Sequence, residues 1–128
     1  MERRTINAAD APASEQFGYA QAVEIAGAAR LLHVSGQIPV SADGTVPEGF
    51  AAQSRQAWAN VEAQLRAAGM TLDNLVKVTT FLSDRRYGME NRTIRAEVLG
   101  KRRPAITVIV CEIFDAAWLL EIEAVAAA

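Results

Sequence analysis

The segment that decides the fold is PAITVIVCEIF, residues 104–114. Its β-branched residues predict a strand, and the side chains of a strand alternate between its two faces. The apolar residues are Ile106, Val108 and Val110 on one face, and Ile109, Cys111 and Ile113 on the other. A strand that is apolar on both faces needs cover on both. We therefore expect this segment to lie in a sheet that is buried from two sides.

Two helices are predicted upstream of this strand. Apolar residues recur at helical spacing over residues 48–70, and Gly69 ends this amphipathic helix. Residues 85–100 form the second helix, which Gly100 ends. Between them, NLVKVTTFLSD (residues 74–84) has the alternation of a strand. A helix that joins two strands is the connection that parallel pairing requires.

Four further strands complete the pattern. RRTINA (residues 3–8) is the first. YAQAVEIAG (residues 19–27) and ARLLHVSG (residues 29–36) are predicted to form a hairpin around Gly27. WLLEIEAVA (residues 118–126) is the last strand, after a short turn.

The order β-β-β-α-β-α-β-β indicates an α+β fold, with residues 1–128 as one domain. We expect one mixed sheet with two helices on one face. Because two helices cover only one face, the second apolar face predicts an obligate oligomer.

Composition narrows the class of protein. The chain of 128 residues is 51% hydrophobic and has a net charge of −2, with no long basic block, so we expect no nucleic-acid partner. A single Cys excludes an intrachain disulfide and a Cys-rich metal site. No apolar run is long enough to span a membrane, and the N-terminus lacks the pattern of a signal peptide. We expect a cytoplasmic protein.

The sequence contexts of the single histidine and the single cysteine favour structural roles for both. His33 is the only histidine and lies in an apolar strand, so neither a catalytic triad nor a histidine-ligated metal is supported. Cys111 is interpreted as a small buried side chain.

Two carboxylates and one amide are better candidates. Glu121 and Glu123 point to the same face of the last strand, in partly apolar company. A buried carboxylate is paired, protonated or functional. For Glu121 catalysis and structure are equally favoured, whereas Glu123 favours an ion pair between subunits. Asn91 lies on the buried stripe of the second helix, where capping a loop is slightly favoured over ligand contact.

Several motifs together resemble the RidA (YjgF) family of small trimeric proteins, over nearly the whole chain. They are Ala11-Pro12, Gly18-Tyr19, SGQIP (residues 35–39), AAQSRQAWANVEAQLRAAG (residues 51–69), VKVTTFLSD (residues 76–84), Asn91, Pro104-Ala105 and EIEAVA (residues 121–126). The resemblance implies a RidA-like, chorismate-mutase-like fold that closes into a trimeric barrel.

The resemblance also implies a site between neighbouring subunits that uses no cofactor and no metal. Deaminating members of the family hydrolyse reactive enamines and imines to a keto acid and ammonia. Carried over by position, Glu121 holds the attacking water, Tyr19 and Asn91 shape the pocket, and Ser35 and Gly36 line its wall.

One departure from the family concerns residue 106. Deaminating members place an arginine directly after the Pro-Ala of the fifth strand, where it binds the substrate carboxylate through two charge-assisted hydrogen bonds. This chain has Ile106, which offers neither charge nor donor. Three hypotheses follow: hydrolysis of a different, neutral or more apolar imine or enamine; a ligand-binding or stress-related trimer without turnover; or replacement of the arginine by Arg102 or Arg103, which is the least favoured.

Overall fold

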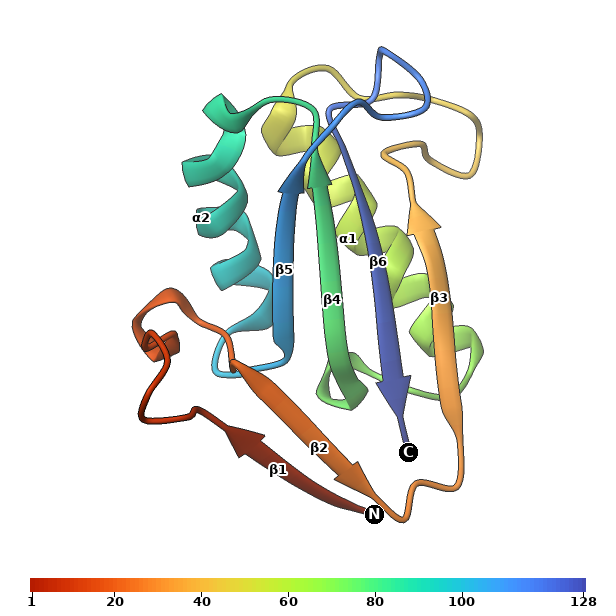
Figure 1. The fold of residues 1–128 in the computed structure, drawn as a ribbon. Helices are drawn as coiled ribbons and strands as arrows, with labels where there is room; N and C mark the ends of the chain where they lie inside the picture. Colours follow the sequence, from red (N-terminus) through yellow and green to blue (C-terminus); the bar gives the residue numbers. More distant parts are fainter.

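The computed structural model describes residues 1–128 (Figure 1). Six strands and two α-helices form its framework. They are β1 (Glu2–Ile6), β2 (Ala22–Ala26), β3 (Leu31–Gln37), α1 (Phe50–Ala67), β4 (Leu75–Leu82), α2 (Gly88–Leu99), β5 (Ala105–Val110) and β6 (Leu120–Ala127). Three short 3-10 turns are η1 (Glu15–Phe17), η2 (Leu72–Asn74) and η3 (Arg85–Tyr87).

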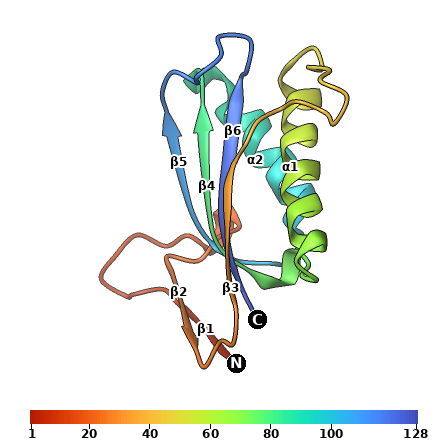
Figure 2. The ribbon, with the colours of Figure 1, turned by 90° about the vertical axis from the view of Figure 1, so that its right-hand side faces the viewer.

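The main sheet has four strands in the order β3-β6-β4-β5. β4 and β5 run parallel, while β6 is antiparallel to both β3 and β4. The helix α2 forms the crossover between β4 and β5, as the sequence predicts. Both helices lie on the same face of this sheet, and the other face is open (Figure 2). The α+β class predicted from the sequence is thus confirmed.

The prediction of a single sheet is wrong in one respect. β2 pairs with β1, from Glu2 opposite Ala26 to Ile6 opposite Ala22, and these two strands form a separate small sheet. The predicted hairpin around Gly27 does not form, because β3 pairs with β6 instead of β2. The backbone N–H groups of Ala29 and Arg30 donate to the Ala128 carbonyl, and these bonds carry the chain away from β2 to the end of β6.

The fifth strand is shorter than predicted. It ends at Val110, because its partner β4 ends at Leu82 and offers no further carbonyl beyond one bond from the Cys111 N–H. Cys111 therefore follows the strand and is only half-buried, in contrast to the predicted mid-strand position. The second helix also begins later than predicted, because Arg85–Tyr87 form a 3-10 turn before it.

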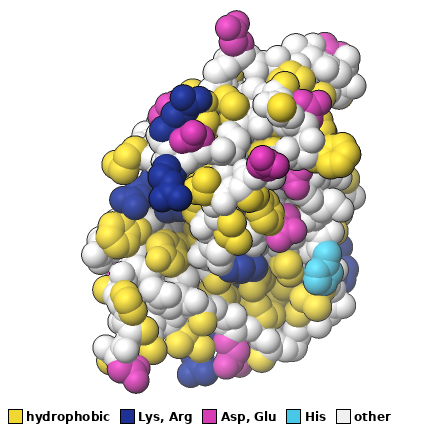
Figure 3. Space-filling view, turned by 45° about the horizontal axis from the view of Figure 1, so that its top comes forward, with side chains coloured by type: hydrophobic (Ala, Val, Ile, Leu, Met, Phe, Trp, Pro, Cys, Tyr) yellow, Lys and Arg dark blue, Asp and Glu magenta, His cyan; other side chains and the backbone are white.

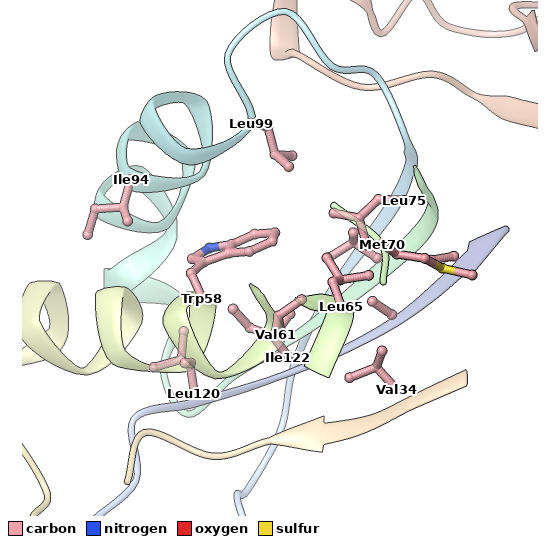
Figure 4. Close-up of a cluster of buried hydrophobic side chains, with 14 of the residues drawn as sticks. Val34, Trp58, Val61, Leu65, Met70, Leu75, Ile94, Leu99, Leu120 and Ile122 are labelled. Atoms are coloured by element: carbon pink, nitrogen blue, oxygen red, sulfur yellow. The ribbon is translucent and has the colours of Figure 1, made fainter. Parts of the chain in front are cut away.

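The hydrophobic core lies between the helices and the sheet. Trp58, Val61 and Leu65 of α1 are fully buried, and they form one cluster with Ile94 and Leu99 of α2 (Figure 4). The sheet contributes Leu75 and Val78 from β4, and Leu120 and Ile122 from β6. Each fully buried side chain of this size contributes about 1.5–3 kcal/mol to folding.

The open face of the sheet is mixed in character. Thr79 lies opposite Glu123 and Phe81 opposite Glu121 in the pairing of β4 with β6. Lys77 points to the same face and donates to the Thr107 hydroxyl of β5 at 2.6 Å. The uniformly apolar second face predicted from residues 104–114 is therefore limited to the β5 edge. There Val108, Ile109 and Val110 are 41%, 44% and 44% exposed. Neither helix has the length and apolarity that a membrane span requires.

Candidate functional site

A cavity of about 610 Å³ lies at the outer edge of β5, where η1, η3 and α2 approach the strand. Tyr19, Asn91 and Ile106 all line this cavity, although they come from three separate segments of the chain. The volume falls in the range of small-molecule pockets, about 300–1,000 Å³. The structure thus brings together three of the six site residues predicted from the resemblance.

The loop that carries Tyr19 is fastened from both sides. Ser14 is fully buried, and its hydroxyl donates to the Tyr19 carbonyl at 2.8 Å. On the other side, the Ala20 N–H donates to the Pro104 carbonyl at 3.1 Å, and Ala20 forms a parallel bridge with Ala105. These bonds hold Tyr19 beside the first residues of β5.

Asn91 lies in the first turns of α2 and is only 2% exposed. Its side chain makes no hydrogen bond within the chain and lines the cavity. The capping of a strand end or a loop, slightly favoured from the sequence, is not seen within the chain. Because a buried amide needs a partner, this geometry favours contact with a ligand. The start of α2 is held in place by Tyr87, whose ring stacks on Phe50 with centroids 4.6 Å apart.

Ile106 pairs with Val78 of β4 and packs partly against the core, and its remaining surface forms an apolar wall of the cavity. Ile106 is therefore a cavity residue, and its role as the replacement of the family arginine stays a prediction.

Gly36 and Glu121 meet at a different place. The Glu121 side chain lies directly over Gly36, so a Cβ added at Gly36 would come within 2.6 Å of the carboxyl carbon. Gly36 has no left-handed φ, so this position needs glycine for space alone. Glu121 takes part in none of the four ion pairs of the chain.

The two groups of predicted residues are not united within one chain. Ile106 is paired with Val78, which faces the helices, whereas Glu121 is paired with Phe81, which points to the open face. Ser35 is exposed on β3 and lines a shallow hollow with Lys77 and Glu123. Each chain therefore carries two separated partial sites.

Sequence reasoning missed a group of arginines around the cavity. Arg85, Arg86, Arg92 and Arg95 line it, and no aspartate or glutamate does. In Figure 3, Lys and Arg side chains gather on the side of the molecule where α2 lies. The available signal was helical spacing: Arg95 stands four residues after Asn91 and therefore shares its face.

Arg95 is the most buried of these arginines, at 6% exposed. Its Nη2 donates to the Phe17 carbonyl at 2.9 Å, and no carboxylate lies within ion-pair distance of it. Burial lowers the pKa of Arg95, and the nearby charge of Arg92 lowers it further. Arg92 lies over the Phe17 ring, 4.7 Å from its centroid.

The hypothesis that Arg102 or Arg103 replaces the missing arginine is not supported. Arg102 forms an ion pair with Asp73, with its Nε 2.6 Å from Oδ1. Arg103 donates to the carbonyls of Gly100 and Arg102, and neither arginine lines the cavity. The cations beside Ile106 come from η3 and α2 instead.

The fold and cavity define a small α+β protein with an arginine-lined cavity at a sheet edge. Comparison with known proteins agrees with this fold. The family model described as Endoribonuclease L-PSP matches residues 8–128. A RutC family protein from Pyrococcus horikoshii is 34% identical over 110 residues, covering 84% of this chain and 85% of the relative.

Two further relatives are informative. The 2-iminobutanoate/2-iminopropanoate deaminase of Escherichia coli strain K12 is 41% identical over 83 residues, which cover 63% of this chain and 61% of that enzyme. The crystal structure of YyfB, a member of the conserved Rid protein family from Yersinia pestis, has 31% identity, covers 100% of both chains and gives a TM-score of 0.88. The chain belongs to the RidA/YjgF family, which confirms the resemblance seen in the sequence.

Proposed function

We propose that this protein hydrolyses a reactive enamine or imine to a carbonyl compound and ammonia, without a cofactor. The proposal extends to this chain the reaction class named in the Escherichia coli relative, a 2-iminobutanoate/2-iminopropanoate deaminase. It differs in substrate, because Ile106 provides no charge for a carboxylate at that point of the cavity.

The observation that carries this proposal is the division of the site. Glu121, seated over Gly36, points to the open face, while Tyr19, Asn91 and Ile106 line a cavity at the β5 edge. In a trimer whose open faces meet, the β5 edge of one subunit approaches the Glu121 face of the next. The complete site then contains a carboxylate from one subunit and a binding cavity from its neighbour.

The chemistry requires few groups. Water adds to the carbon of the C=N bond while Glu121 accepts a proton from it, and the nitrogen takes up a proton. The resulting carbinolamine loses ammonia as its C–N bond breaks and its hydroxyl becomes the carbonyl. The atoms balance as imine plus water to carbonyl compound plus ammonia, with no redox step.

The test is ammonia release from a panel of imines generated in the assay mixture. We expect Glu121→Gln to lower kcat by about 10²–10⁴-fold, the usual contribution of a general base. Glu123→Gln is the matched control, because Glu123 lies on the same strand and face but is exposed. Gly36→Ala displaces the carboxylate and should reproduce much of the loss. Equal turnover in Glu121→Gln and the wild type would refute the proposal.

A second candidate function is a ligand-binding trimer without turnover. Ile106 favours it, because the position that binds substrate in deaminating relatives is apolar here. Ligand-induced increases in melting temperature without ammonia release from any imine would establish this alternative.

A further inference from the structure

The cavity at the β5 edge carries more positive charge than its surroundings explain. Four arginines and no acidic residue line it, although the whole chain has a net charge of −2. Of the seven arginines outside the cavity, four have carboxylate partners: Arg4 with Glu24, Arg55 with Glu97, Arg66 with Glu62 and Arg102 with Asp73. The other three donate only to backbone carbonyls. None of the four cavity arginines has a carboxylate partner, and Arg95 is the one arginine of the chain that is buried.

At Arg95 the missing carboxylate has a free-energy cost, because the guanidinium is buried. It is buried to 6% exposure, and its single bond within the chain leads from Nη2 to the neutral carbonyl of Phe17. An arginine keeps its proton in proteins, so burial leaves a charge without a counter-charge. The lowered pKa of Arg95 has the same cause, since burial and then the charge of Arg92 disfavour its protonated form.

Asn91 is a second donor at this cavity, and its side chain makes no hydrogen bond within the chain. It precedes Arg95 by one helical turn, is 2% exposed and lines the same cavity. Its amide N–H groups and the remaining guanidinium N–H groups of Arg95 can therefore donate to an acceptor on a ligand. Arg92 is held over the Phe17 ring and adds a second positive charge at the same end of the cavity.

We propose that this end of the cavity binds the phosphate group of a small phosphate monoester. A phosphate monoester carries nearly two negative charges at neutral pH and three strong acceptor oxygens. A single carboxylate would balance one guanidinium, whereas a phosphate balances both Arg95 and Arg92 and also accepts from Asn91. The organic part of the ligand lies along Tyr19 and Ile106.

That the phosphate belongs to the substrate rests on the proposed function. That the cavity binds a phosphate group does not depend on the proposed function. In combination, the two proposals describe an imine or enamine with a phosphate group distant from the reacting carbon. Such a substrate needs no arginine at position 106.

Calorimetric titration with phenyl phosphate tests the inference, with phenyl sulfate as a monoanion of the same shape. We expect one phenyl phosphate per chain and clearly weaker binding of phenyl sulfate. Binding of phenyl phosphate should weaken as the pH falls from about 7.5 to about 5.5, because the second phosphate pKa is about 6. Binding of phenyl sulfate should not change over this range.

Variants locate the site. Arg95→Gln should weaken phenyl phosphate binding by about 30-fold or more, as for the loss of one partner in a buried charge pair. Arg92→Gln tests the same end of the cavity at an exposed position, so its folding is not at risk. Arg55→Gln is the matched control, because Arg55 lies outside the cavity in an ion pair with Glu97.

The inference is overturned if phenyl phosphate does not bind, if phenyl sulfate binds equally well, or if Arg95→Gln and Arg92→Gln both bind as the wild type does. Saturable binding of a short RNA without binding of phenyl phosphate would also overturn it. Imine hydrolysis without phosphate binding refutes this inference alone, and phosphate binding without hydrolysis refutes the proposed function alone.

Discussion

At the scale of single residues, two positions shape the candidate site by what they lack. Gly36 has no side chain, and the Glu121 carboxylate occupies the vacant space above it. Ile106 has no charge, and its side chain lies between the core, against which it packs, and the cavity, which it lines. The absence of a side chain at Gly36 leaves room for the Glu121 carboxylate, and we expect the apolar side chain of Ile106 to affect which ligand binds.

Ile106→Arg tests the second of these effects. We expect the wild type to show little acceleration of 2-aminoacrylate hydrolysis, and the variant to gain about tenfold or more, because a guanidinium forms a paired hydrogen bond with the substrate carboxylate. A coupled assay that generates 2-aminoacrylate measures both.

Val108→Arg is the control for that experiment, since Val108 lines the same cavity and is already exposed. An equal gain in both variants would reflect added charge alone. Rapid hydrolysis by the wild type would show that α2 arginines already bind the 2-imino acid carboxylate.

At the scale of elements, the segment before β2 positions the phenol of Tyr19. It has little regular structure, and its order comes from Ser14, which joins the Tyr19 carbonyl, and from the bond of Ala20 to Pro104. These partly buried hydrogen bonds order the loop that carries Tyr19.

Ser14→Ala should loosen this loop. The change leaves the partly buried Tyr19 carbonyl without its partner, so we expect the free energy of unfolding to fall by about 1–2 kcal/mol. Denaturant unfolding measures this loss. Ser83→Ala, at a half-buried position outside the loop, should have little effect. Equal stability of the wild type and Ser14→Ala would show that the loop does not depend on this bond.

At the scale of the whole molecule, one face of the main sheet remains uncovered. Both helices pack on the opposite face, and the apolar β5 edge continues into a loop where Phe114 is 98% exposed. Exposed apolar surface of this kind marks an interface. The family resemblance indicates a trimer, whose assembly would also complete the divided site.

Light scattering at micromolar concentration should therefore give about three times the chain mass of 13.8 kDa. Ile109→Lys should weaken assembly, because it places a charge at the β5 edge, whereas Ala52→Lys on the exposed side of α1 should not. A stable folded monomer of the wild type would contradict both the trimer and the shared site.

The sequence by itself determined what depends on local periodicity. The helical spacing in α1 and α2, the alternation in β4 and β6, and the common direction of Glu121 and Glu123 all follow from residues a few positions apart. The family motifs are also local, so the positions of Tyr19, Asn91 and Ile106 could be assigned to one cavity before the structure was known.

Only the tertiary structure decided what depends on pairing between distant segments. β3 leaves β2 because Ala29 and Arg30 bond to Ala128 at the far end of the chain. β5 ends at Val110 because its partner β4 ends at Leu82. The residue pattern of β5 alone does not predict this end point, because it depends on the length of the partner strand. Arg95 is an ordinary helical arginine in the sequence; in the structure it is a buried charge whose one partner is the neutral carbonyl of Phe17, and no carboxylate is paired with it.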